Sequence, residues 1–582
     1  MARIKLLDVD TVNKIAAGEV IERPASAVKE MVENSIDAGS TRILVELEEG
    51  GRNLIKVTDD GCGMDPDDLS LAFQKHATSK IRSASDLNNI STLGFRGEAL
   101  ASIASVAGSV EVCTKTRSAT AGSYVKIGDG KISDTKEMGW PAGTAVTVRD
   151  LFKNVPARRK YLKGAGSELL KVTELITEMA IINYKTSFEL ISGKRSVFKS
   201  NRSKSWNDIL TKLLGLNVAK GMIPFQAEAK GCSFHGVASD PTTTRSTSDW
   251  IYTFVNGRAI YSKALISAVK EAYRSSIPSG RCPIAVVSIE IDPTLVDVNV
   301  HPTKREVRFL YEEGMALALT GAISSALASR TQVQKAEIPQ RYLRPPEPSP
   351  ERAVLAQEQK TLSMEAPNPQ IEVKMESSRK DLPKVPDRKA PEVKILGQVM
   401  KLYIVAESAE GLVLIDQHAA AERVKYETLR SKYRNRRISQ ELAEPVNIDL
   451  SPKEQVLLDA WKDVLAEIGF QIYPFGGSTY SVKAVPALGR RIENPEAIHD
   501  ILRDLFAMGK VSQDSIFKDE VLKLLACRGS VKSGREISMG EMRSLLGDLY
   551  ACESPETCPH GRPVAAVLDE DKLERIFGRK YQ

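Results

Sequence analysis

The chain has 582 residues, a net charge of +6 at pH 7, 42% hydrophobic and 27% charged residues, which is ordinary for a soluble globular protein of about three or four domains. No uncharged apolar run approaches the ~18 residues of a membrane span, and the charged N-terminus is unlike a signal peptide. We therefore expect no membrane association, a cytoplasmic location, and seven cysteines that serve as thiols or metal ligands.

The first predicted element is a helix between Pro24 and Gly39, because proline suits a first helical position and glycine a C-terminal cap. Glu30, Asn34 and Asp37 recur at i, i+4 and i+7 and share one face. Their oxygens suit a metal-phosphate site, with Asn34 as a Mg²⁺ ligand and Glu30 as the base that deprotonates water. On spacing alone, a solvated helix face is an equally good interpretation.

Two strands are expected next, on either side of a Glu-Glu-Gly-Gly turn. Asp59 ends the second strand, where its carboxylate can accept a hydrogen bond from an adenine amino group, while Gly61 and Gly63 let the base approach the backbone. Gly94 and Gly97 bracket a loop that leads into a helical run, and backbone N–H groups at a helix start can hold phosphates. Each glycine motif alone is weak.

A second block of strands and helices runs from about 218 to 330. Residues 331–390 contain nine prolines, one aromatic residue and no glycine, and this composition predicts a flexible tether. Beyond it we expect a buried strand at 411–415 that feeds a helix, and further helices near 452–468 and 514–526.

The helix after the buried strand carries a candidate metal site. His418 and Glu422 are four residues apart, so their side chains share a face and can chelate one ion. Asp416 stands at the N-cap position, which makes capping its alternative role. Glu427 points elsewhere by helical geometry, and we expect it to orient a ligand or to form a salt bridge.

Cys558 and His560 supply further candidate ligands, and both leave the same face if this segment is extended. Cys527 is a third contributor, with core packing an equal alternative. Thiolate, imidazole and carboxylate together fit Zn²⁺ or Mn²⁺ better than Mg²⁺. Two interpretations stay open on these residues: a structural zinc clip, and a hydrolytic site that cuts phosphodiesters.

Taken in order, the N-terminal motifs resemble the ATP-binding fold shared by DNA gyrase B, Hsp90, histidine kinases and MutL. Within that group, segments 18–24, 76–80, 143–158 and 297–309 look like the MutL family of DNA mismatch-repair ATPases. The resemblance implies an α+β architecture. Its first two domains are then a GHKL (Bergerat) ATPase sandwich at 1–215 and a ribosomal-S5-like domain at 216–330. A disordered Pro-rich linker at 331–391 leads to an α/β C-terminal dimerisation and endonuclease domain at 392–582, which carries an inserted regulatory subdomain at about 441–525.

The resemblance also implies nucleotide-binding roles. Glu30 is then the general base, Asn34 the Mg²⁺ ligand and Asp59 the adenine partner, while Lys304 reaches the γ-phosphate from the second domain. An ATP lid is expected at 76–97. The other implied contacts are Asp37, Gly61, Gly63, Thr78, Ser79, Lys80, Gly94, Phe95, Arg96, Gly97, Glu98, Ala99, Leu100 and Thr144. A cation that crosses from another domain lets ATP and ADP favour different domain arrangements.

The segment 416–427 resembles the endonuclease motif of nicking MutL proteins, Asp-Gln-His-Ala-x-x-Glu-x-x-x-x-Glu, and segments 526–528, 558–560 and 577–579 look like its companion motifs. The resemblance implies catalytic roles for Asp416 and Glu422. It implies Zn²⁺ and/or Mn²⁺ at a site formed by His418, Glu422, Cys527, Cys558 and His560. Many relatives have His or Lys where Arg528 stands, so Arg528 is not carried over as a ligand.

The implied partners are double-stranded DNA, the mismatch-recognition protein MutS, and a second copy, joined through the C-terminal domain and by an ATP-dependent N-terminal contact. Basic clusters at 153–163 and 194–204 favour phosphate contact, with solvated surface as the alternative. Residues 440–445 weakly resemble a sliding-clamp peptide, with a plain helix-to-loop exit as the alternative. Another reading is a mismatch-repair matchmaker with no nuclease activity and only a structural metal. The ATPase subunit of a type II topoisomerase is disfavoured because the sequence shows no cleavage domain. A histidine kinase is disfavoured because the sequence shows no convincing phosphoacceptor helix.

Overall fold

A computed structural model describes residues 20–80, 92–94, 97–128, 131–245, 247–278, 280–297, 307–333, 393–435, 439–487, 495–509, 515–529, 535–577 and 579. Three of our predictions lie outside these residues: the linker at 331–391 in nearly all its length, Lys304, and the lid residues Phe95 and Arg96.

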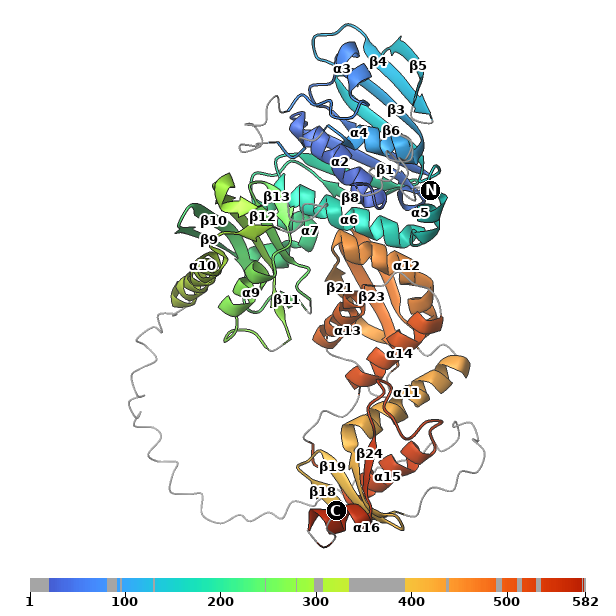
Figure 1. Cartoon of the computed structure of the whole chain (residues 1–582). Helices are drawn as coiled ribbons and strands as arrows, with labels where there is room; N and C mark the ends of the chain where they lie inside the picture. The colour runs from blue at the N-terminus through green and yellow to red at the C-terminus, as the bar shows by residue number, and fades with distance from the viewer. Residues whose placement is uncertain are drawn as a thin grey trace, which may run out of the picture.

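The N-terminal region is an eight-stranded sheet of order β5-β4-β3-β6-β2-β1-β7-β8 with helices packed on it (Figure 1). Its strands are β1 (Arg42–Glu48), β2 (Leu54–Asp59), β3 (Ala107–Lys115), β4 (Gly122–Gly128), β5 (Lys131–Met138), β6 (Gly143–Leu151), β7 (Ser187–Ser192) and β8 (Arg195–Ser200). Its helices are α2 (Pro24–Asp37), α3 (Pro66–Leu71), α4 (Ala99–Val106), α5 (Pro156–Tyr161), α6 (Ala165–Ile182), α7 (Trp206–Leu214) and α8 (Leu216–Lys220). Apolar residues of α2, α4, α6 and the sheet form one buried cluster.

The local signals in this region are confirmed. Helix α2 begins at Pro24, and Gly39 follows its C-cap with φ +70. The two predicted strands are β1 and β2, which pair antiparallel so that Ile43 lies opposite Asp59. Because β2 alternates buried and half-exposed residues, it presents Asp59 at the edge of the core, beneath α2.

The second region is a five-stranded sheet of order β13-β12-β15-β10-β9, backed by α9 and α10 (Figure 1). Its elements are β9 (Met222–Ala229), β10 (Cys232–Ser239), β12 (Ile251–Val255), β13 (Arg258–Ile260), α9 (Lys263–Ala272), β15 (Ala285–Ile291) and α10 (Glu312–Val333). Two short pairs accompany it: β11 (Thr244–Arg245) with β14 (Cys282–Pro283), and β16 (Val296–Asp297) with β17 (Arg308–Phe309).

The C-terminal region contains two sheets with separate apolar clusters. The first has the order β18-β19-β20-β24 and comprises β18 (Lys394–Val399), β19 (Tyr403–Ser408), β20 (Gly411–Asp416) and β24 (Ala565–Leu568), with α11 (Gln417–Asn435), α15 (Met539–Tyr550) and α16 (Glu570–Ile576). The second, which we call the inserted unit, comprises β21 (Ser439–Asp449), α12 (Pro452–Ile468), β22 (Gln471–Gly476), β23 (Thr479–Pro486) and α13 (Pro495–Ala507). Helix α14 (Ser515–Gly529) then returns the chain to α11.

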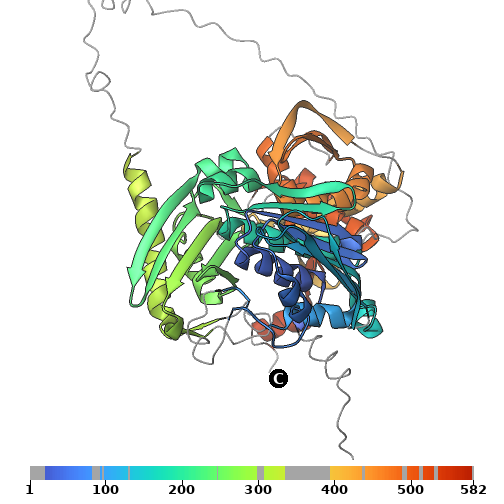
Figure 2. The ribbon, with the colours of Figure 1, turned by 90° about the horizontal axis from the view of Figure 1, so that it is seen from above.

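The inserted unit lies between the N-terminal region and the four-stranded sheet (Figure 1), and the view from above shows it beside the eight-stranded sheet (Figure 2). The predicted α+β architecture is confirmed, as are β20, α12 and α14. The helix-to-loop exit at 440–445 is wrong, because this segment belongs to β21 and its pairing with β23 is interrupted between Glu441 and Val446. None of the described helices is long and apolar enough to span a bilayer.

Candidate nucleotide pocket and metal centre

A cavity of about 720 Å³ opens between α2, the end of β2 and the segments before α4. Fourteen of the predicted nucleotide contacts line it: Glu30, Asn34, Asp37, Asp59, Gly63, Thr78, Ser79, Lys80, Gly94, Gly97, Glu98, Ala99, Leu100 and Thr144. Gly61 does not line the cavity, and its N–H instead donates to Asp59 Oδ1 at 2.9 Å. The structure therefore gathers residues that are up to 114 positions apart in sequence into one chamber, from Glu30 to Thr144.

Asp59 is held at the base of this cavity by two neighbours. The hydroxyl of Ser35, which is buried, lies 2.8 Å from Asp59 Oδ2, opposite the bond from Gly61. A carboxylate that is oriented in this way keeps lone pairs for a donor in the cavity, such as an amino group. We did not single out Ser35 from the sequence, although a serine within a helix beside Asn34 was the available signal.

The glycine motifs have steric causes. Gly63 has φ +75, and a Cβ there would lie 2.1 Å from the carbonyl oxygen of Lys115, so the turn packs directly on β3. Gly97 has φ +64, and a Cβ would lie 2.4 Å from the carbonyl oxygen of Ala77. His76 N–H donates to Gly97 at 3.1 Å, so these two parts of the predicted lid rest on each other.

Lys80 occupies the place beside the predicted Mg²⁺ ligand. Its Nζ donates to Asn34 Oδ1 at 2.9 Å and pairs with Asp37 Oδ2 at 2.5 Å. The backbone N–H groups of Leu93 and Gly94 also donate to Asp37, at 3.0 and 3.1 Å. The side chain of Glu30 lines the same cavity, and its carboxylate makes no hydrogen bond or ion pair within the described part of the chain. The Asp37 carboxylate is thus engaged within the protein, whereas the Glu30 carboxylate faces the cavity.

A contact that sequence reasoning missed joins the second region to this pocket. Arg258, which opens β13, donates from Nη2 to the carbonyl oxygen of Thr92 at 2.8 Å. Thr92 directly precedes Leu93, whose N–H holds Asp37. The second region therefore reaches the segment beside Asp37 through an arginine. The segment of Lys304 lies outside the described residues, so its predicted contact stays a prediction. The asparagine-glycine turn before Arg258 was visible in the sequence. The hydrogen-bond partner of Arg258, which lies 166 residues away, was not.

The C-terminal candidate ligands converge at the start of α11. Glu422, Cys558 and His560 offer ligand atoms that all lie within 4.8 Å of one another. Glu422 Oε2 is 3.4 Å from His560 Nδ1, and Glu422 Oε1 is 3.3 Å from His418 Nε2. Glu422 and Cys558 are buried, whereas both imidazoles are partly exposed. A sulfur, nitrogens and a carboxylate form a donor set that suits Zn²⁺.

The segment of Cys558 and His560 is a turn rather than an extended strand, which corrects our geometric premise. Gly561 N–H donates to the carbonyl oxygen of Cys558 at 2.9 Å, and Arg562 N–H donates to its Sγ at 3.4 Å. The turn brings both side chains to Glu422. Cys527 is exposed and does not join this cluster. Burial, and then the Glu427 carboxylate, raise the pKa of the nearby Cys552 to about 12, so that thiol stays protonated.

The two remaining acidic residues of this segment have structural partners. Asp416 Oδ1 accepts hydrogen bonds from the N–H groups of His418 and Ala419, at 2.8 and 3.0 Å, as an N-cap does. Glu427 accepts from the N–H groups of Glu553 and Ser554, at 2.5 and 3.2 Å, and pairs with Arg423. The predicted salt-bridge role of Glu427 is confirmed, and it anchors the loop that leads to Cys558.

Comparison with known proteins decides the family. Residues 21–140 match the model of the histidine kinase-, DNA gyrase B- and HSP90-like ATPase, residues 210–328 the C-terminal domain of DNA mismatch repair proteins, and residues 396–537 the MutL C-terminal dimerisation domain. The DNA mismatch repair protein MutL of Methanothrix thermoacetophila is 49% identical over 580 residues and covers 100% of both chains. The chain belongs to the MutL family.

Other relatives extend the match. MutL of Symbiobacterium thermophilum is 37% identical, with 100% of both chains covered. The solved Aquifex aeolicus MutL ATPase domain with ADP is 29% identical, covers 47% of this chain and 94% of its own, and has a TM-score of 0.36. This member of the family is thus a DNA mismatch-repair protein with a GHKL ATPase domain, which supports ATP as its nucleotide, and a dimerisation domain, which supports a homodimer.

Proposed function

We propose that this MutL protein is an ATP-gated homodimer that nicks one DNA strand through its C-terminal metal centre. In the N-terminal pocket, Asp59 binds the adenine amino group and Asn34 holds Mg²⁺ with the phosphates. Glu30 deprotonates the attacking water, and its lack of a partner among the described residues supports this role. Lys80 leaves Asn34 when Mg·ATP enters, because both need the same side-chain oxygen.

ATP binding moves the second domain relative to the first. Lys304 contacts the γ-phosphate, and the hydrogen bond from Arg258 to Thr92 couples the second domain to the lid. A conformational change of the lid on ATP binding is then transmitted to the arrangement of the two domains. The N-terminal domains of two copies close into a second dimer contact, and the linkers form a ring around DNA after the partner MutS has found a mismatch.

The nicking proposal rests on one observation: a buried carboxylate, Glu422, lies between His418 and His560 and beside Cys558. A divalent ion held by these side chains supplies a Lewis acid for phosphodiester hydrolysis. Glu422 is the residue whose charge would hold the ion in this pocket. Asp416 caps α11 and, in this proposal, also faces the substrate phosphate from the helix start.

The two basic clusters differ in how far their side chains are available for contact with DNA. In the cluster at 194–204, Arg195 pairs with Asp459 and Lys199 with Glu189, so these two are engaged within the protein. In the cluster at 153–163, Lys160 and Lys163 are exposed, and we assign sequence-independent phosphate contact to them. Residues 443–445 leave the β21 pairing and are exposed, which supports a sliding-clamp peptide at 440–445.

A matchmaker with a structural metal is the second candidate. It is favoured by Asp416 and Glu427, because both carboxylates already serve as a helix cap and a loop anchor. This leaves few acidic residues to make an open catalytic site, and closed sites rich in Cys and His are usually structural.

The deciding experiment is nicking of supercoiled plasmid with Mn²⁺, comparing wild type with Glu422→Ala and with Glu410→Ala, an exposed carboxylate in the turn between β19 and β20. All three proteins are first matched for folding and dimerisation. Relaxed circles from wild type and Glu410→Ala alone support the nuclease. Equal relaxation by all three refers the activity to a contaminant or another site. No relaxation by any, even with ATP and a clamp, supports the matchmaker.

A further inference from the structure

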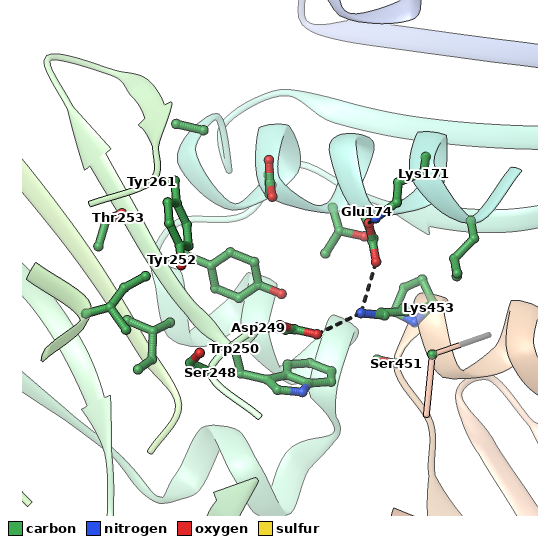
Figure 3. Close-up of a pocket in the computed structure, with 18 of the residues that line it drawn as sticks. Lys171, Glu174, Ser248, Asp249, Trp250, Tyr252, Thr253, Tyr261, Ser451 and Lys453 are labelled. Atoms are coloured by element: carbon green, nitrogen blue, oxygen red, sulfur yellow. Dashed lines mark hydrogen bonds and ion pairs between the residues drawn. The ribbon is translucent and has the colours of Figure 1, made fainter. Parts of the chain in front are cut away.

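Helix α12 of the inserted unit lies against α6 of the ATPase region, and a cavity of about 510 Å³ remains where the two helices meet the second sheet (Figure 3). Its wall comes from three parts of the chain. Glu174 belongs to α6, Asp249 and Tyr252 flank the start of β12, and Lys453 opens α12. Segments from the N-terminal, second and C-terminal regions therefore meet at one point.

The contact has an apolar part. Leu170 of α6 is 4% exposed, and it belongs to the same buried cluster as Leu457 and Trp461 of α12. Leu169 and Val197 are partly buried against this cluster and against the core of the ATPase region. Without the inserted unit, Leu170 would face solvent on the outer side of α6, and covering it is favourable.

Lys453 adds an ionic part. Its Nζ lies 2.9 Å from Glu174 Oε1 and 3.0 Å from Asp249 Oδ2 (Figure 3). Burial lowers the pKa of Lys453, but the attraction of both carboxylates outweighs it and leaves that pKa above its ordinary value. The first turn of a helix disfavours a cation. Glu174 and Asp249, the two carboxylates that pair with Lys453, both lie outside the inserted unit.

Two further contacts define the rest of the surface. Arg195 of β8 forms an ion pair with Asp459 of α12. Gly215, between α7 and α8, has φ +88, and a Cβ there would lie 2.5 Å from the carboxylate of Asp449 at the end of β21. A side chain at position 215 would therefore collide with Asp449 of the inserted unit.

We propose that this surface is an intramolecular latch, by which the inserted unit docks on the nucleotide-free ATPase domain and Lys453 holds the first and second domains together. The proposal rests on the ATP-driven domain movement proposed above. If that movement separates Glu174 from Asp249, Lys453 cannot reach both, so ATP binding loosens the docking. By reciprocity, docking opposes the ATP-bound arrangement. The C-terminal region is thereby held on the ATPase domain, through the inserted unit, until ATP binds.

Small-angle X-ray scattering of the full-length dimer without nucleotide tests the docking. We expect Lys453→Glu to raise the radius of gyration, and its fold should be kept because glutamate suits the first turn of a helix. Lys462→Glu, the same change at an exposed site of α12, should not raise it. Arg195→Asp and Asp459→Arg should each expand the protein, and the double variant should return it to the wild-type dimension. Equal dimensions for wild type, Lys453→Glu and both single variants overturn the latch.

Steady-state ATP hydrolysis tests its consequence. Lys453→Glu should raise the rate by roughly three- to tenfold, since each exposed or half-buried ion pair contributes up to about a factor of five. Unchanged hydrolysis in an expanded variant overturns the regulatory part. A non-hydrolysable ATP analogue should expand wild type. If it binds without doing so while Lys453→Glu still expands, docking stands but the proposed ATP-driven movement is wrong.

Discussion

Removing the amino group of Lys80 tests whether a lysine stands in for Mg²⁺ before nucleotide arrives. In Lys80→Met, Asp37 loses its cation while it stays almost buried, with 8% of its side chain exposed. Breaking a fully buried pair costs about 3–5 kcal/mol, and an exposed pair about 0.2–1 kcal/mol. Asp37 keeps two backbone N–H partners, so we expect a loss of about 2 kcal/mol.

The assay is differential scanning calorimetry of the full-length protein, following the transition that nucleotide shifts, because that transition reports the ATPase domain. For a domain of about 150–250 residues, 1 kcal/mol moves Tm by about 2–4 °C, so Lys80→Met should lower it by about 4–8 °C. Lys131→Met, at an exposed strand position, is the matched control and should leave Tm unchanged.

Magnesium without nucleotide sharpens the test. In wild type the oxygens of Asn34 and Asp37 are already engaged by Lys80, so added Mg²⁺ should not shift this transition. In Lys80→Met the same oxygens become available, and Mg²⁺ should recover part of the lost Tm. A variant whose Tm stays within about 1 °C of wild type and does not respond to Mg²⁺ would refute the stand-in role.

Further predictions concern hydrolysis, the domain contact, the metal loop and the latch. Glu30→Ala should bind ATP normally in a fluorescent-nucleotide titration but lose at least about 100-fold in kcat, and unchanged turnover would remove it as the base. Arg258→Met should weaken ATP-dependent N-terminal dimerisation, measured by sedimentation, while ADP affinity stays near wild type; loss of all nucleotide binding would show a wider defect. Glu427→Gln should lower the amount of metal bound per protein, although Glu427 itself is not a ligand, because the loop before Cys558 loses its anchor. An unchanged metal content would contradict this. The latch should be insensitive to pH from about 6 to 9, and expansion within that window would count against Lys453 and Glu174 as its partners. Salt above about 0.5 M should loosen the latch because it screens ion pairs.

The pH window follows from the groups around Glu174. Lys171 and Glu178 lie on the same helix, and Lys453 and Asp249 line the cavity from the other elements. Burial raises the pKa of Glu174, but Lys453 and Lys171 outweigh it and hold that pKa below 4.5. This stabilisation is therefore full above pH 4.5 and is lost as pH falls through the folded pKa. The pKa of Lys453 lies above 10.5, so its contribution is full below that pH and is lost above it.

Local patterns predicted the parts of the pocket that lie on one element. The spacing of Glu30, Asn34 and Asp37 placed them on one helix face, and all three line the cavity. The proline and glycine signals at the ends of α2 were sufficient for its boundaries, because they act within a few residues. The buried strand before α11 was predictable for the same reason, since its apolar run and the helical period that follows are both local.

What the sequence could not predict depends on contacts between distant segments. No pattern indicates that Arg258 reaches Thr92, or that Lys453 reaches Glu174 from another region of the chain. The turn at Cys558 was also missed, because the hydrogen bond from Gly561 that closes it competes with an extended conformation that the sequence equally allows. Residue type and spacing alone thus suit several roles, and only the side-chain contacts in the folded protein distinguish between them.

The surfaces between regions combine apolar packing with polar contacts, and the polar part suits a protein that must change arrangement. Trp250 and Phe254 of the second region belong to the apolar cluster of the ATPase region, and Leu170 packs in the cluster of the inserted unit. Arg258, Arg195 and Lys453 add polar contacts at the same junctions. An apolar interface of similar extent would resist separation, because opening it exposes its whole area to water. Ion pairs at half-buried sites cost little to break, since each partner is rehydrated. In the ATP-driven movement proposed above, nucleotide binding then has to offset the loss of these polar contacts and of the apolar contact at Leu170.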